Sequence, residues 1–186
     1  MPFQIPSLTR IPTTPFTGKQ SPSSGPPICQ QHEFECSMIP MAELFGWKQE
    51  IDFKVVERRV RSMHKALQAL IDNAELRELN PFWQKAIQLK NQGLAGDINT
   101  FHLFQTGYYG EQGLQIISNT LPRVLIFPDN IHPLTSAQFV AFVLIPEVAA
   151  CLVMEDMGPG ADKTQAIGRM MDSSAYGALM FPAGDS

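Results

Sequence analysis

Apolar side chains recur at alternating three- and four-residue steps between Asp52 and Asn73. This spacing places them on one side of an α-helix, so the segment predicts an amphipathic helix about 30 Å long. Its apolar seam consists of Phe53, Val56, Val60, Met63, Leu67 and Leu70. Positions with the same alternation on another face carry the basic side chains Lys54, Arg58, Arg61 and Lys65. The pattern therefore predicts a helix with an apolar face and a row of positive charges.

Start and stop signals mark five further helices. Asn80 and Pro81 are typical of a helix cap and a first helical residue, and Gly93 is a typical stop. A short helix is predicted from Glu111 to Thr120.

The last third of the chain carries the other three predicted helices. Thr135 and Gln138 match a capping box for the first, Pro146 begins the second, and Asp162 with Gln165 caps the third. The helix that begins at Pro146 is apolar on nearly all sides, which is typical of a buried central element. No strand is predicted. The sequence therefore predicts an all-α fold, a compact bundle of about six helices.

Two segments lack an apolar period. Residues 1–28 hold seven of the 15 prolines and eight serines and threonines. Such a stretch buries too little apolar surface to offset the ordering of the chain, so we expect a disordered linker there and a single helical domain over residues 29–186. A linker of this kind often precedes the C-terminal module of a longer protein.

The aromatic, glycine-rich stretch from Gly93 to Gly113 is expected to be a long ordered loop, and such loops tend to be functional.

The charge balance limits the function. The chain has 186 residues and a formal net charge of −4, and residues 29–186 hold 12 basic against 18 acidic side chains. This balance excludes bulk attraction to polyanions as the main activity. A local nucleic-acid groove stays open, because the basic row and the adjacent rings of Tyr108 and Tyr109 could bind phosphates and stack on bases. The alternative is a solvated helix face and two tyrosines that close a loop over the core.

Three cysteines are an odd number for a chain of this size, so we expect no disulfide framework and a reducing compartment. Cys29, His32 and Cys36 have spacings that a zinc site could use, but a closed structural site needs a fourth ligand. The alternative is that these residues dock the start of the domain onto the helices. We predict no metal and no cofactor, and we expect Cys151 to be a buried thiol.

The chain lacks the familiar signatures of catalysis. The stretch "GPGADKT" resembles the end of a phosphate-binding loop, but Asp162 stands where a glycine should precede the lysine, and a helix precedes it instead of a strand. We therefore expect a loop and a helix cap there. No hydrolase, zinc-protease or cysteine-nucleophile motif occurs, so no catalytic residue is predicted.

The acidic pair Glu155 and Asp156 lies in the last turn of a predicted helix, where carboxylates oppose the helix dipole. We expect either an intramolecular partner among the arginines between residues 58 and 61, or a charged patch for a basic ligand. An enzyme of unrecognised class would need one pocket that gathers both residues with Glu147 and a histidine.

The longest apolar runs, 139–145 and 148–154, are separated by Pro146 and Glu147 and are shorter than the ~20 residues of a membrane helix. The N-terminal segment lacks a charged stretch followed by an apolar core, so we expect no secretory leader. The expectation is a soluble intracellular protein.

Several motifs together carry a family resemblance. They are "CQQHEFECSMIP", "IDFKVVERRVRSMHKAL", "GYYGEQGLQII", "IHPLTSAQFVAFVLIPEVAACLVMEDM" and "SSAYGALMFP". In this order they resemble the C-terminal domain of the fungal restriction of telomere capping protein four family, over residues 29–182. The resemblance implies a protein of the nucleus and cytoplasm, linked to telomere-end protection, and it supplies no catalytic residues.

Two functions follow as hypotheses. The first is a non-catalytic interaction module that docks a protein partner in a chromatin or telomere-capping-related process, through the loop around Tyr108 and Tyr109 and through charged helix surfaces. The second is direct DNA or RNA binding through Lys54, Arg58, Arg61 and Lys65 together with the two tyrosines.

Overall fold

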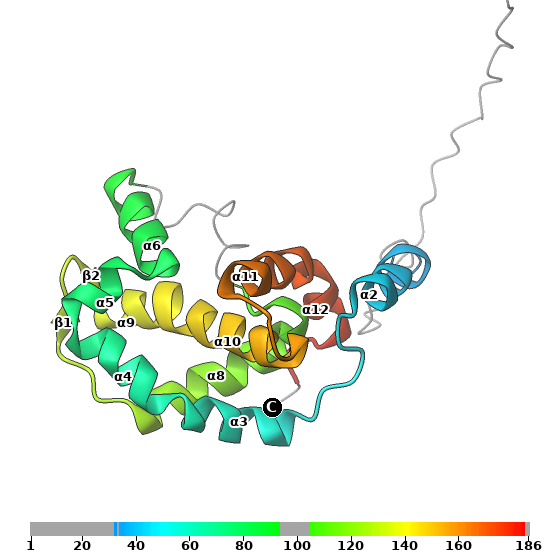
Figure 1. Ribbon diagram of the computed structural model, residues 1–186, viewed down its shortest axis with the longest axis horizontal. Coiled ribbons are helices and arrows are strands. Elements are labelled where there is room, and N and C mark those ends of the chain that lie inside the picture. The colour runs from blue at the N-terminus through cyan, green and yellow to red at the C-terminus, as the bar shows by residue number, and fades with distance from the viewer. Residues whose placement is uncertain (1–31, 33, 94–104, 185–186) are drawn as a thin grey trace, which may run out of the picture.

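Helices make up most of the described structure (Figure 1). The computed structural model describes residues 32, 34–93 and 105–184, so the predicted linker at residues 1–28 lies outside the described residues. The α-helices are α2 (Ile39–Phe45), α3 (Phe53–Ser62), α4 (His64–Asp72), α5 (Ala74–Glu78), α6 (Pro81–Asn91), α8 (Gly110–Val124), α9 (Ser136–Phe139), α10 (Ile145–Met157), α11 (Lys163–Asp172) and α12 (Ser174–Met180). Shorter helical turns cover Phe34–Met38, Gly107–Tyr109 and Val140–Leu144, and two short strands, β1 (Asn130–Ile131) and β2 (Leu134–Thr135), form an antiparallel pair. The predicted all-α fold is confirmed, with more helices than the sequence indicated.

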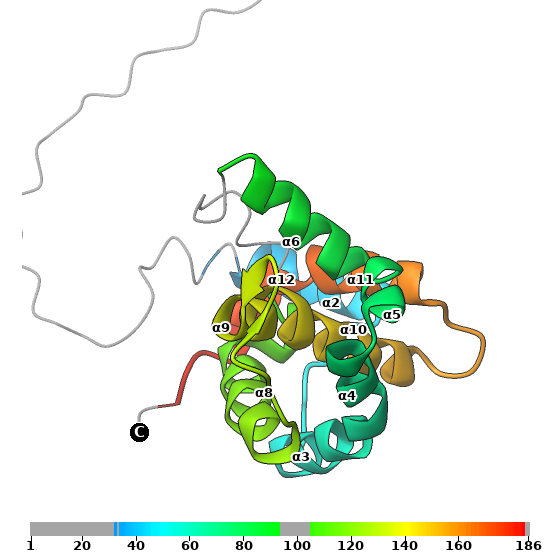
Figure 2. The same ribbon diagram turned by 90° about the vertical axis from the view of Figure 1, so that its left-hand side faces the viewer.

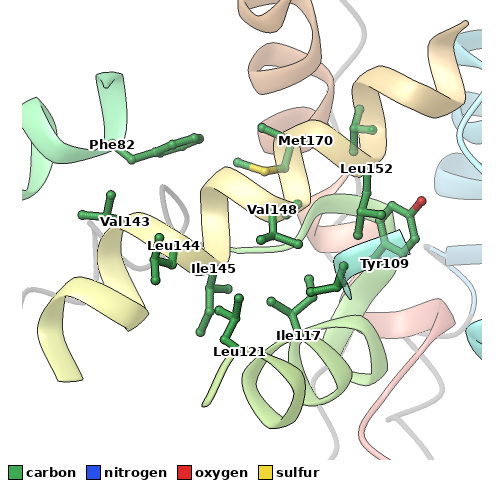
Figure 3. Close-up of a cluster of buried hydrophobic side chains, with 14 of the residues drawn as sticks. Phe82, Tyr109, Ile117, Leu121, Val143, Leu144, Ile145, Val148, Leu152 and Met170 are labelled. Carbon is green, nitrogen blue, oxygen red and sulfur yellow. The ribbon is translucent and has the colours of Figure 1, made fainter. Parts of the chain in front are cut away.

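The central element is α10, as predicted. In both ribbon views it runs between α8 on one side and α11 on the other (Figures 1 and 2). The close-up in Figure 3 shows Val148 of α10 between Ile117 and Leu121 of α8 and Met170 of α11, and all four side chains are fully buried. Burying an aliphatic side chain of this size contributes about 1.5–3 kcal/mol relative to leaving it exposed, so this packing is a main source of stability.

The helix that contains α10 is longer than the sequence predicted. It is continuous from α9 through a π-helical segment, Val140–Leu144, into α10. Pro146 lies in the first turn of α10, as predicted, but it does not separate the two apolar runs, because the π-helical segment leads directly into α10. A change of hydrogen-bond register there accommodates a residue without an amide hydrogen.

By length and composition alone, Ser136–Met157 could cross a membrane. Its most apolar window has a hydropathy of 2.1, and 61% of that window is buried within the fold. The buried core helix of a folded domain can be as long and as apolar as a membrane-spanning helix. The 61% burial of this window agrees with the central position of α10.

The helix predicted over residues 52–73 is in fact two helices, α3 and α4, which meet at the turn residue Met63. The Ser62 hydroxyl donates to the carbonyl oxygen of Arg59 at 2.6 Å, and Nδ1 of His64 lies 3.2 Å from the carbonyl oxygen three residues before it. These side chains compete with backbone amides for the carbonyls of the last turn, which favours the end of α3 there. Figure 1 shows α4 leaving α3 at an angle.

The predicted helix caps are present. The Asn80 side-chain oxygen accepts from two amides in the first turn of α6, at 2.9 and 3.1 Å. Thr135 and Gln138 form a complete capping box, and Asp162 accepts from the amide of Gln165 at 2.8 Å. Caps depend on residues close in sequence, so local sequence was sufficient to predict them.

Candidate functional site

Tyr108 and Tyr109 lie in the core, each only 1% exposed. They form a 3₁₀ turn directly before α8, within the segment that the sequence indicated as a loop; residues 94–104 of that segment lie outside the described residues. The two rings stack with centroids 5.1 Å apart, and both hydroxyls donate to Oδ2 of Asp156, at 2.9 and 2.5 Å. Of the two interpretations that the sequence left open, the structure shows the tyrosines packed in the core and not a stacking platform, because burial leaves neither ring face accessible to a base or a partner.

Arg59 joins the same cluster from α3. Its guanidinium donates to the Glu155 carboxylate at 2.8 Å, to the Tyr109 hydroxyl at 2.8 Å and to the backbone oxygen of Leu152 at 2.9 Å. It also lies 3.2 Å from Oδ1 of Asp156. Of the two expectations for the acidic pair, the structure shows the intramolecular arginine partner. We call Arg59, Tyr108, Tyr109, Glu155 and Asp156 the Asp156 cluster.

The Asp156 cluster keeps its tyrosines protonated. Burial, together with the nearby Asp156 carboxylate, raises the pKa of Tyr108 and of Tyr109 well above the ordinary value of 10.0. Burial alone would lower the pKa of Arg59, but its interactions with Tyr109, Glu155 and Asp156 raise it above its ordinary value. The arginine is therefore charged and the tyrosines are neutral donors at neutral pH, which suits a structural tie between α3, the 3₁₀ turn before α8, and α10.

The predicted basic row is exposed, but it is not one straight line. Lys54 and Arg58 lie on α3, whereas Lys65 lies on α4 beyond the break. Within the described residues these three side chains make no hydrogen bond or ion pair. Arg61 donates twice to one oxygen of Glu57, at 3.0 and 2.7 Å, so part of its charge is compensated.

A second polar cluster surrounds Glu147 at the start of α10. Lys163 Nζ donates to both carboxylate oxygens at 2.5 and 2.6 Å, and Asn80 Nδ2 donates at 2.8 Å. The Cys151 sulfur lies 3.8 Å from the same carboxylate, and burial followed by the charge of Glu147 raises the pKa of this thiol to about 11. The cluster forms the polar end of a pocket of about 340 Å³, which is otherwise lined mainly by leucines such as Leu67.

The groups of the enzyme hypothesis are not brought together. Glu147 lies in the first turn of α10, whereas Glu155 and Asp156 lie in its last turn. Among the described residues, no histidine is hydrogen-bonded to either group. Lys163, from the stretch resembling a phosphate-binding loop, is bound to Glu147 instead.

The possible zinc ligands are only partly described. Nδ1 of His32 lies 3.2 Å from the sulfur of Cys36, and both side chains are exposed. Cys29 lies outside the described residues. In the described part of the chain, no three His, Cys, Asp or Glu side chains are grouped as metal ligands.

A groove that the sequence did not indicate lies between α2 and α11 and has a volume of about 650 Å³. We call it the α2–α11 groove. Its lining includes Met41, Phe45, Trp47, Met157, Arg169 and Asp172. Met41 is 44% exposed and Phe45 is 50% exposed, and the neighbouring Leu44 on α2 is 78% exposed. Helix α2 therefore presents several large apolar side chains to solvent.

A signal for α2 is present in the sequence. Pro40 stands at the start of the helix and Gly46 follows its end in the left-handed conformation, with φ +66°. Proline at the start and glycine after the end form a recognised helix pattern. Helix α2 faces α11, which lies more than a hundred residues later in the chain. No local sequence pattern indicates this tertiary contact.

Comparison with known families decides which family this is. The family described as "RTC4-like domain" matches residues 82–182, more than half of the chain. The chain belongs to the RTC4-like domain family. The resemblance found in the sequence is thereby confirmed. Neither the curated proteins nor the solved structures gave a match.

The RTC4-like domain match begins in the first turn of α6 and extends past the end of α12. It contains Glu147 and its neighbours Cys151 and Lys163 but not Asn80, and it contains the Asp156 cluster except for Arg59. The basic residues of α3 and α4 precede the match, as does α2. The α2–α11 groove therefore has one wall from the matched RTC4-like region and one wall from the preceding segment.

Proposed function

We propose that this protein is a non-catalytic interaction module that docks a protein partner in a telomere-capping-related process, in the nucleus and cytoplasm. Membership of the RTC4-like domain family supports the telomere-related part of the proposal. The buried state of Tyr108 and Tyr109 moves the docking surface away from their loop.

The observation that carries the docking proposal is the α2–α11 groove. Monomeric proteins seldom expose clustered large apolar side chains unless the patch has a function. Here Met41, Leu44 and Phe45 are all substantially exposed on one short helix. The floor beside them is fixed, because Trp47 is 6% exposed and its ring lies 5.5 Å from the ring of Tyr176. Aromatic and methionine side chains are enriched in the cores of protein interfaces, and the strongest contacts lie in well-packed pockets, so this apolar surface beside a fixed floor suits a site that buries side chains from a partner.

Proximity labelling in cells tests this function. The whole chain is fused to a labelling enzyme and compared with a Leu44→Asp/Phe45→Asp variant, and with Ile126→Asp as a matched control on another surface. All three positions are highly exposed, so the fold is expected to persist in each variant. We expect the original chain and the control to label the same proteins, including proteins at chromosome ends, and the double variant to lose them. Equal labelling by all three chains, or labelling without telomere-associated proteins, would contradict the proposal.

Nucleic-acid binding is the second candidate, favoured by one observation. Lys54, Arg58 and Lys65 are exposed, and within the described residues no acidic side chain is paired with them. Unpaired cations on one surface can bind phosphates, with an affinity that falls steeply as salt rises.

Fluorescence anisotropy with labelled single- and double-stranded DNA at low and physiological salt tests this candidate. Arg58→Glu/Lys65→Glu should weaken binding, whereas Arg123→Glu, an exposed basic residue on α8, serves as the matched control. An absence of binding at low salt, or equal loss in the control, would exclude this surface.

A further inference from the structure

The α2–α11 groove contains a charged side chain, Arg169, whose charge acts on the neutral, buried hydroxyl of Tyr108. Arg169 is half-buried on α11 and lines the groove. Within the described residues this side chain has no hydrogen-bonded or ion-paired partner. Removing an arginine partly from water is unfavourable unless the charge gains a partner. The free protein therefore holds a cation beside an apolar surface, where an anion would be bound favourably.

The end of α2 lies beside this side chain. A side-chain carbon at Gly46 would lie 3.8 Å from Nη1 of Arg169, so the guanidinium is positioned directly over the end of the helix. Both ribbon views show α2 near α11 and α12 (Figures 1 and 2). The guanidinium is thus held between the two walls of the groove.

The apolar wall provides the other half of the site. The rings of Phe45 and Trp47 stack with centroids 5.9 Å apart, and Met41 and Met157 line the same groove. Methionine side chains adapt to different shapes and make favourable contacts with aromatic rings. This lining, in a volume of about 650 Å³, suits one or two bulky apolar side chains from a bound peptide.

We propose that the α2–α11 groove binds an acidic, apolar peptide segment of a protein partner. A bulky apolar side chain of the peptide lies against Met41, Phe45 and Trp47, and a neighbouring Asp or Glu pairs with Arg169. This inference rests on the proposed docking function and specifies the chemistry of the partner.

Asp172 does not reverse this preference. It also lines the groove, but it is exposed, so water and salt screen its charge more strongly than that of Arg169. An arginine can also form two parallel hydrogen bonds with a carboxylate, which gives direction as well as charge attraction. The half-buried arginine therefore dominates the selection of the peptide.

Selection from a phage-displayed library of random linear peptides on the whole chain tests the proposal. Enriched peptides are then synthesised, and their binding is measured by fluorescence anisotropy against the original chain, Arg169→Gln, Phe45→Ser and the control Arg123→Gln. We expect enriched peptides to carry Asp or Glu beside a bulky apolar residue. Arg169→Gln should weaken their binding about tenfold, since a hydrogen bond to a charged group is lost, and Arg123→Gln should leave it unchanged.

Three results would overturn the proposal: no enriched peptide, enriched peptides without an acidic residue, or equal binding by Arg169→Gln and the original chain. Thermal melting of each variant shows whether the fold is intact. The proximity-labelling experiment separates this inference from the docking function. If labelling is lost in Leu44→Asp/Phe45→Asp but persists in Arg169→Gln, then the groove docks a partner and the acidic chemistry is refuted.

Discussion

Replacing Asp156 with alanine should destabilise the protein far more than replacing its neighbour Glu155. Asp156 has a side chain that is 11% exposed, and it accepts from two buried tyrosine hydroxyls and pairs with Arg59. A hydrogen bond to a charged group contributes about 1.5–3 kcal/mol, and breaking a buried ion pair by removing one partner costs about 3–5 kcal/mol. The two magnitudes do not add in full, because Arg59 keeps its bond to Glu155 and so is not left without a partner. We therefore expect Asp156→Ala to lower the free energy of unfolding by about 3–5 kcal/mol.

Glu155 supplies the matched control. Its side chain is 47% exposed, and its described partner is Arg59. Water screens such a pair, so Glu155→Ala should cost less than about 1 kcal/mol. Urea denaturation followed by the fluorescence of Trp47 and Trp83 measures both variants. A cost below about 1 kcal/mol for Asp156→Ala, or equal costs for the two variants, would refute the view that the buried carboxylate holds the cluster together.

Three further predictions concern other parts of the core. Lys163→Met leaves the buried carboxylate of Glu147 without its cation and should lower the free energy of unfolding by about 2 kcal/mol, and adding Glu147→Met should recover part of this loss in urea titrations. Gly177→Ala places a carbon in steric overlap with the backbone oxygen of Gly107, so it should cost more than about 2 kcal/mol in a thermal melt, whereas Gly184→Ala meets open space and should be neutral. The Cys151 thiol, with a folded-state pKa raised to about 11 from 9.0, should contribute fully to stability below pH 9 and lose this contribution as the pH rises through about 11. Alkylation of Cys151 in the folded protein should accelerate as the pH rises toward about 11, because the thiolate is the reactive form.

Each of these predictions has an outcome that contradicts it. Equal stability of Lys163→Met and the original chain would show that Glu147 is not held by the lysine. A Gly177→Ala variant as stable as Gly184→Ala would show that α12 can move away from its neighbours. Fast alkylation of Cys151 near neutral pH, measured by mass spectrometry of its peptide, would show that the thiol is not held protonated by burial.

The local sequence was sufficient to predict the helical class and most helix starts. The caps at Asn80, Thr135 and Asp162 occur where the sequence places them, because a capping side chain binds amides only two or three residues away. The apolar composition of α10 also identified the central helix, since a segment without a polar face must be surrounded by other elements.

Contacts between distant segments determined the rest. The sequence around Tyr108 and Tyr109 left open whether their rings are exposed or close a loop over the core. Asp156, 47 and 48 residues later, decides this, because it holds both hydroxyls in the core. The same applies to Arg169, whose place opposite α2 depends on how α11 packs. Periodicity and capping report interactions within about one helical turn, whereas burial, ion pairing and grooves depend on which helices meet. For this reason the sequence by itself determined an all-α protein with a buried central helix, and only the tertiary structure decided which of its side chains are free to bind a partner.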